Sequence, residues 1–198
     1  MLHDQYRLKK RGYGQVEYNF SYYSFCGVDK AGLLSALGMR DTGNVDAHGQ
    51  FDFTMAQLPD QWIVCRYNNL GNPPAVMRQA LSLHGMLIAC DVHEGEHVSR
   101  VECYEQGELK WSILHDGEAG DTLDLQVAGI VPPEFTALRK AAFSAQQKAD
   151  HDGVTAHCMY WLPLDFAASL SGYRYDRETF PWGTPRFTEI EPVVPAAT

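Results

Sequence analysis

Residues 98–114, with the sequence VSRVECYEQGELKWSIL, determine how the middle of this chain folds. Polar and apolar side chains alternate on both sides of Glu105-Gln106-Gly107, which is the pattern of two strands joined by a tight turn. A type I turn with Gly107 in the left-handed conformation fits these three residues, because glycine adopts that conformation without steric cost. The sequence therefore predicts an antiparallel hairpin.

The turn also fixes which residues of the two strands face each other. Pairing outward from it places Glu102 opposite Lys110 on a polar face exposed to solvent. The other face is apolar and contains Val101, Cys103, Leu109 and Trp111. One apolar and one charged face is what a half-buried antiparallel hairpin requires.

The rest of the chain predicts further strands and helices around this hairpin. Strands are expected at residues 16–25, 51–58, 61–67, 86–92 and 157–162. Helices, with their capping residues, are expected at 29–38, 72–85, 132–148 and 163–172. This order predicts an α+β fold, in which a mainly antiparallel sheet packs with three to four helices in a single-domain sandwich. The domain is expected to span residues 1–198, with an extended C-terminal tail from about residue 177.

Composition narrows the class of protein. The chain has 198 residues, of which 45% are hydrophobic and 12% aromatic, so it can bury a substantial core. No apolar run approaches the roughly 20 residues that cross a bilayer, and Lys and Arg residues interrupt the N-terminal region where a signal peptide would be apolar. We therefore expect a cytoplasmic protein that has no membrane partner and binds no cofactor.

Negative charge is concentrated in the middle of the sequence. Between Asp91 and Asp124 ten carboxylates stand against two cations, which accounts for eight of the nine net negative charges. Nucleic acid is not expected as a direct partner, because phosphate binding needs a basic surface. A concentrated acidic surface instead suits a basic protein partner. The candidate contact residues are Glu102, Glu105, Glu108, Asp116, Glu118 and Asp121, with Tyr104 and Trp182 as aromatic anchors.

Residues 93–97, HEGEH, match the H-E-x-x-H pattern of zinc metalloproteases. That chemistry needs both histidines on one face of a helix, with the glutamate acting as a general base. Here a glycine interrupts the segment and strand-like residues flank it, so a hairpin loop is the simpler interpretation. A metal-dependent hydrolase using His93, Glu94 and His97 is one alternative. A small-molecule or peptide-binding module is another.

Three stretches carry a family resemblance. They are residues 58–64 (LPDQWIV), 107–116 (GELKWSILHD) and 162–176 (LPLDFAASLSGYRYD). With shorter segments around residues 37–39 and 41–43, this pattern resembles bacterial immunity proteins, the cognate inhibitors of toxins delivered by contact-dependent or type VI secretion systems.

The resemblance implies a cytoplasmic protein without enzymatic activity that binds a toxin domain tightly and blocks its active site. It assigns no functional residue, since such inhibitors recognise their toxins through variable surfaces. The acidity suggests that the toxin domain is basic, for instance a nuclease that binds phosphates. The sequence thus predicts an immunity protein that acts by occlusion through an acidic surface.

Overall fold

A computed structural model describes residues 19–67 and 75–193. Within these ranges nine strands form one antiparallel sheet, around which four α-helices and two short 3₁₀ helices pack. The expected α+β class is therefore confirmed. None of the helices in these ranges has the length and apolar content that crossing a membrane needs.

The strands are β1 (Asn19–Cys26), β2 (Met39–Val45), β3 (Phe53–Gln57), β4 (Ile63–Tyr67), β5 (Met86–His93), β6 (Val98–Glu105), β7 (Glu108–Asp116), β8 (Gln126–Gly129) and β9 (Thr188–Pro192). The helices are α1 (Lys30–Leu37), α2 (Ala75–Leu81), η2 (Ser82–His84), η3 (Gly117–Ala119), α3 (Glu134–His151) and α4 (Cys158–Ser171).

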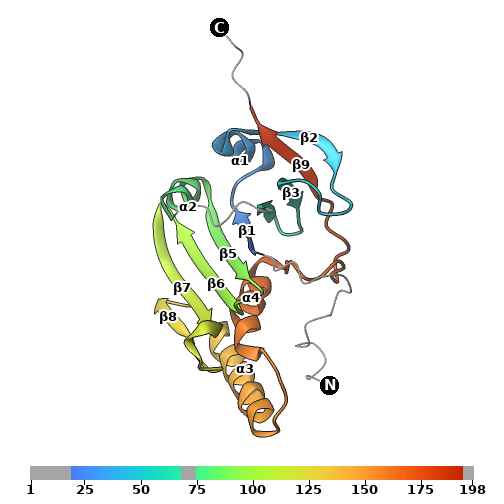
Figure 1. Ribbon diagram of the computed structural model, residues 1–198. Coiled ribbons are helices and arrows are strands. Elements are labelled where there is room, and N and C mark those ends of the chain that lie inside the picture. The colour runs from blue at the N-terminus through green and yellow to red at the C-terminus, as the bar shows by residue number, and fades with distance from the viewer. Residues whose placement is uncertain (1–18, 68–74, 194–198) are drawn as a thin grey trace.

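The strand order is β2-β9-β3-β4-β1-β5-β6-β7-β8, so β1 is central and β2 and β8 form the edges (Figure 1). The chain returns late to this sheet, because β9 inserts between β2 and β3. The tail expected from about residue 177 is thus wrong for residues 188–192. Only Ile190 of β9 is fully buried, which left too weak an apolar pattern to predict a strand.

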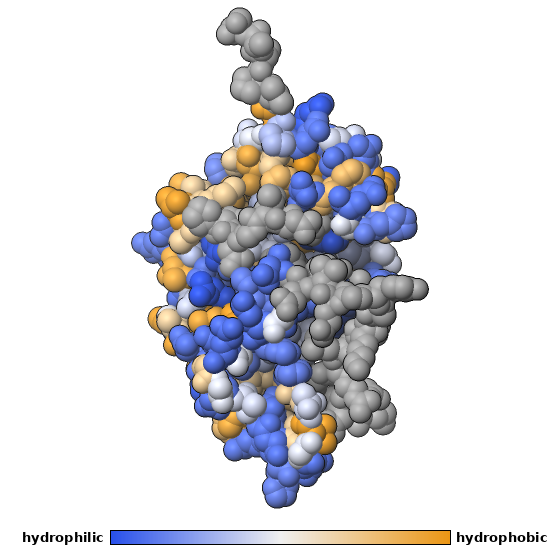
Figure 2. Space-filling model, in the orientation of Figure 1, coloured by the Kyte–Doolittle hydropathy of each residue, from blue (hydrophilic) through white to orange (hydrophobic). Residues whose placement is uncertain are grey.

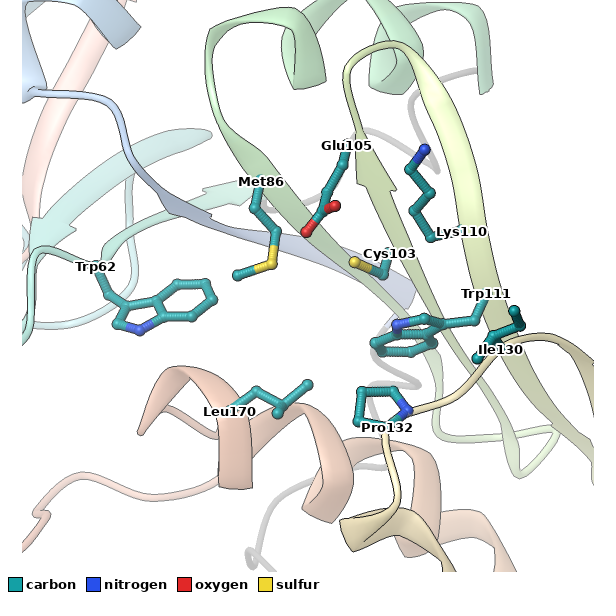
Figure 3. A pocket seen from close by; sticks show the side chains of 9 residues that line it. All are labelled: Trp62, Met86, Cys103, Glu105, Lys110, Trp111, Ile130, Pro132 and Leu170. Atoms are coloured by element: carbon teal, nitrogen blue, oxygen red, sulfur yellow. The ribbon is translucent and has the colours of Figure 1, made fainter.

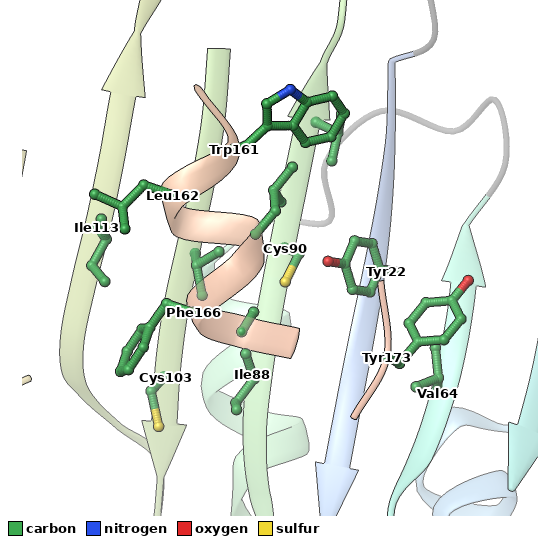
Figure 4. Close-up of a cluster of buried hydrophobic side chains, with 14 of the residues drawn as sticks. Tyr22, Val64, Ile88, Cys90, Cys103, Ile113, Trp161, Leu162, Phe166 and Tyr173 are labelled. Atoms are coloured by element: carbon green, nitrogen blue, oxygen red, sulfur yellow. The ribbon is translucent and has the colours of Figure 1, made fainter. Parts of the chain in front are cut away.

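Two cores lie on the two faces of the sheet. Successive strand residues point to opposite faces, so Tyr22 joins one core and its neighbour Tyr23 joins the other. Helix α4 covers the first face, where Phe166 packs near Cys103 and Ile113 (Figure 4), and α3 packs on α4. Helices α1 and α2 supply buried leucines to the second face.

Local capping signals predicted α1 correctly. The Asp29 side chain accepts a hydrogen bond from the Gly32 amide at 2.7 Å, and Gly38 ends the helix in the left-handed conformation. The predicted start of the next helix, at residues 72–74, lies outside the described residues, whereas its body is α2.

The strand predicted at residues 157–162 is wrong, because these residues begin α4. Seven consecutive residues from Cys158 to Leu164 are buried, so the segment has no polar face whose spacing could reveal a helix. Pro163, expected at the first turn, lies inside the helix instead. The predicted end at Gly172 is correct.

The predicted hairpin exists, but its register is wrong. Gln106 and Gly107 both have positive φ (53° and 79°), which is typical of a two-residue type I′ turn that places Glu105 opposite Glu108. A bulge follows, so Glu102 lies opposite Ser112 and not opposite Lys110. The bulge still keeps the side chains of Cys103 and Trp111 on the buried face.

Candidate functional site: the acidic end of the sheet

The surface carboxylates of the acidic segment, residues 91–124, are divided between the two ends of the sheet. Glu105 and Glu108 flank the β6–β7 turn, whereas Asp116 and Glu118 follow the far end of β7. A strand of this length spans about 25 Å, at roughly 3.3 Å per residue. The hairpin tip and the residues after Asp116 are therefore separate surfaces.

Three loops meet beyond the far end of β7. The Gly117 amide donates a hydrogen bond to the His97 carbonyl at 3.2 Å, which joins the β5–β6 turn to η3. The Thr122 hydroxyl donates to Asp150 of α3 at 2.8 Å, which joins the following loop to that helix. We call the surface around these contacts the acidic end, and it comprises Glu96, Asp116, Glu118, Asp121 and Asp150.

Backbone and side-chain donors hold several of these carboxylates in place. Asp116 accepts from the Glu118 amide at 3.0 Å, and Asp121 accepts from the Leu123 amide at 2.9 Å. Across residues 19–67 and 75–193, no Lys or Arg forms an ion pair with any of the five. Four of them are exposed, and the lower part of the molecule in Figure 2 is largely hydrophilic. Their field is thus available to a partner.

Asp150 is a member that sequence reasoning missed. It lies 28 residues after Thr122, near the end of α3, and its other oxygen accepts a hydrogen bond from Gln146 at 2.9 Å. Only the packing of α3 and α4 brings it to this surface. No local signal in the sequence identifies it.

Two residues of the acidic segment form ion pairs inside the molecule and are not available to a partner. Arg78 of α2 is buried, and its guanidinium donates to Asp91 at 2.7 Å and to Glu102 at 2.5 Å. It also donates to the Tyr23 hydroxyl at 2.9 Å, and the Tyr104 hydroxyl donates to Glu102 at 2.8 Å. Burial alone would lower the pKa of Arg78, but the two carboxylates reverse this and keep it charged.

This network corrects the expectation that Glu102 lies on a solvent-exposed face, and the candidate anchor Tyr104 is buried beside it. Tyr104 is only 2% exposed, and the Glu102 carboxylate lies against Arg78 beneath α2. The sequence pattern placed both on the correct strand but could not show that a helix covers that face. They therefore contribute to stability in the described structure.

The other predicted contact residues have different surroundings. Glu108 is exposed and pairs with Lys110 at 2.6 Å, while Glu105 lies beside it at the hairpin tip. Trp182 stacks on Phe180 with ring centroids 4.9 Å apart, and its Nε1 donates to the Gly172 carbonyl at 3.2 Å. The structure thus brings together Asp116, Glu118 and Asp121, but not the remaining candidates.

The HEGEH segment forms the β5–β6 turn, as the loop interpretation predicts. His93 ends β5, and His97 has a φ of 51° just before β6. The two are not one turn apart on a helix, which the zinc-protease pattern requires. The Glu94 carboxylate accepts a hydrogen bond from the Tyr175 hydroxyl at 2.8 Å. In the described ranges no group of three His, Cys, Asp or Glu side chains is arranged to hold a metal ion.

A group of histidines lies under the acidic end. The rings of His97 and His157 stack with centroids 4.1 Å apart, and Tyr160 meets His97 edge-on. The Nδ1–H group of His115 in β7 donates a hydrogen bond to the Asp124 carbonyl at 2.7 Å. Burial, and then the neighbouring histidines, lower the pKa of both His97 and His157, while Glu94 partly opposes this at His97. The stack therefore favours neutral rings.

Comparisons with protein-family models, with curated proteins and with solved structures found no match for this chain. The function must therefore be argued from the residues and their arrangement.

Proposed function

We propose that this protein is an immunity protein that binds a basic toxin domain in the cytoplasm and occludes its active site. The observation that carries the proposal is the acidic end, where five carboxylates gather with no Lys or Arg paired to them in the described part of the chain. Such a surface attracts a basic partner, raises the association rate and biases partner choice. A nuclease, which binds phosphate groups, is a toxin of suitable charge.

The segments that resemble immunity proteins lie in the scaffold of the fold. Residues 107–116 contain all of β7 and the glycine before it, and residues 58–64 form the β3–β4 turn with the start of β4. In residues 162–176 the buried Arg174 pairs with Asp165 and Asp176 and lies 4.5 Å over the Trp161 ring. These residues support the fold, and the contact surface is expected elsewhere. That division agrees with inhibitors that share a scaffold and vary their surfaces.

A hydrolase using the HEGEH segment finds less support. Its histidines are placed by a turn, and Glu94 is already bonded to Tyr175.

Co-expression tests the proposal. The proposal expects a toxin-like reading frame beside this gene, and the C-terminal domain that it encodes is induced with and without this protein. We expect growth to be rescued and the two proteins to co-purify. An inactive point variant of the toxin domain serves as the control for binding without toxicity. If a toxic domain from that neighbour neither binds this protein nor loses toxicity in its presence, the proposal fails.

A further inference from the structure

A pocket of about 310 Å³ lies at the hairpin-tip end of the sheet, on the face that α4 covers (Figure 3). Trp62 forms one side of it and Trp111 the other, with Met86 above and Leu170 of α4 below. Both tryptophans are more than nine-tenths buried, so the pocket walls are fixed by the core. Its lining is mainly apolar and aromatic.

Two charged residues also line the pocket, and they point in different directions. In Figure 3 the Glu105 carboxylate points into the pocket, whereas the Lys110 amine points away from it. The Lys110 amine pairs with Glu108 at 2.6 Å. Within the described residues no side chain forms a hydrogen bond or ion pair with Glu105. Lys110 acts on Glu105 electrostatically but makes no direct contact with it. An aromatic pocket with a carboxylate that has no direct ion pair is complementary to a flat cation.

Strand β8, which the chain leaves just before Ile130 and Pro132 of the pocket wall, is a free strand edge. No strand in the described chain lies beyond β8, and all four residues of β8 are exposed. Its sequence, QVAG, has neither the charges nor the proline that commonly protect an edge from pairing with another chain. The edge thus presents unpaired backbone donors and acceptors.

Gly129 directs the chain from this edge to the pocket. Its φ is +78°, and a Cβ there would lie 2.1 Å from the Lys110 carbonyl oxygen, so only glycine fits. The chain beyond it leaves Ile130 91% exposed and places Pro132 in the pocket wall. At the other end, the loop of the acidic end leads directly into β8.

We infer that β8 accepts an extended segment of a partner protein as an additional strand, and that an arginine of this segment enters the pocket and pairs with Glu105. Backbone pairing along β8 supplies affinity, and the pocket supplies specificity for the cation. The guanidinium stacks against tryptophan and reaches the carboxylate in the same plane. The inference rests on the proposed function only in taking the partner to be the toxin domain.

Peptide binding tests the inference without the toxin. The probe is a short peptide in which valine and threonine alternate around one central arginine, and its control has citrulline, the neutral analogue, in place of arginine. Binding to the whole chain is measured by calorimetry and by amide chemical shifts. We expect the arginine peptide to bind at least about tenfold more tightly, with shifts concentrated at residues 126–130.

Two variants locate the contact. Glu105→Gln should weaken binding of the arginine peptide about tenfold and abolish the preference over citrulline, because it removes the charge and keeps the shape. Glu108→Gln is the matched control, since it removes a carboxylate at the same tip that is paired with Lys110. It should leave the affinity within about twofold.

Several results would overturn the inference. Equal binding of the two peptides, or no effect of Glu105→Gln, would reduce the pocket to a neutral apolar surface. If N-acetylarginine amide bound with equal affinity, the pocket would be a site for a small free cation. Amide chemical-shift changes at β2 would place the added strand at the other edge of the sheet. Peptide binding without a toxin complex would count against the proposed function alone, whereas a toxin complex insensitive to Glu105→Gln would count against this inference alone.

Discussion

Asp91 and Glu102 lie against Arg78 inside the molecule, whereas Glu118 and Asp121 lie at the acidic end without a basic partner in the described chain. All four belong to one acidic stretch of sequence. The difference is decided by what the fold packs above them: α2 covers the first pair, whereas no described element covers the second. The same residue type therefore serves stability in one place and is free to serve recognition in another.

The largest expected effect follows from breaking the buried group. Arg78→Met should lower the free energy of unfolding by about 3–5 kcal/mol, because two carboxylates then remain buried without their cation. Chemical denaturation measures this value. Arg100→Met, on an exposed residue of β6, is the control and should change the value by no more than about 0.5 kcal/mol. A loss below about 1 kcal/mol at Arg78 would mean that water stabilises these carboxylates equally well.

The second effect concerns association with the toxin domain. Glu118→Gln combined with Asp121→Asn should slow association about fivefold at low salt without loss of stability, because the acidic end attracts the partner. The difference in association rate between the variant and the unchanged protein should decrease as the salt concentration increases. Stopped-flow mixing measures the rates.

A matched double variant controls for net charge. Asp52→Asn with Asp60→Asn removes two exposed carboxylates near β3, away from the acidic end. It should leave the association rate nearly unchanged. Equal slowing by both double variants would show that total charge acts, and not the acidic end.

The smallest expected effect is a dependence of stability on pH. The lowered pKa values mean that the folded state favours neutral His97 and His157, whose ordinary pKa is 6.5. Their contribution to stability is complete above about pH 6.5 and is lost as the pH falls through the lowered folded-state values. His115, Tyr160 and Glu94 face the same stack and do not change this direction.

Unfolding experiments from about pH 8 to about pH 5 measure this dependence. His157→Gln should make the decrease in the free energy of unfolding at low pH shallower, because it removes one of the two stacked histidines. His84→Gln, at an exposed position of η2, should leave the decrease in stability at low pH unchanged. An identical decline in all three proteins would exclude the stack as its source.

Local signals in the sequence predicted part of the fold. Asp29 and Gly38 cap α1 as expected, and the alternation in residues 98–114 identified the central hairpin. Edge and late strands were missed for a common reason. β2 and β8 are largely exposed, and β9 buries one side chain completely, so none has the apolar alternation that identifies a strand.

The candidate site was predictable only in part. The expected strand lengths already imply that Glu105 and Asp116 lie at opposite ends of a hairpin, so their separation could have been deduced. The partners of Glu102 and Asp91 could not have been deduced from the sequence. Arg78 lies 24 and 13 residues away from them, and only the packing of α2 on the sheet brings it close.

The position of β9 also sets an order for folding. In the described sheet β2 pairs only with β9, and the hydrogen-bonded residues Thr42 and Glu189 are 147 positions apart. Contacts this distant form late, because a long loop must close before they are gained. During synthesis β2 therefore has no neighbouring strand until the ribosome has passed Pro192. Until then β3 also lacks its outer neighbour, so the growing chain has a temporary edge that chaperones or other chains can reach.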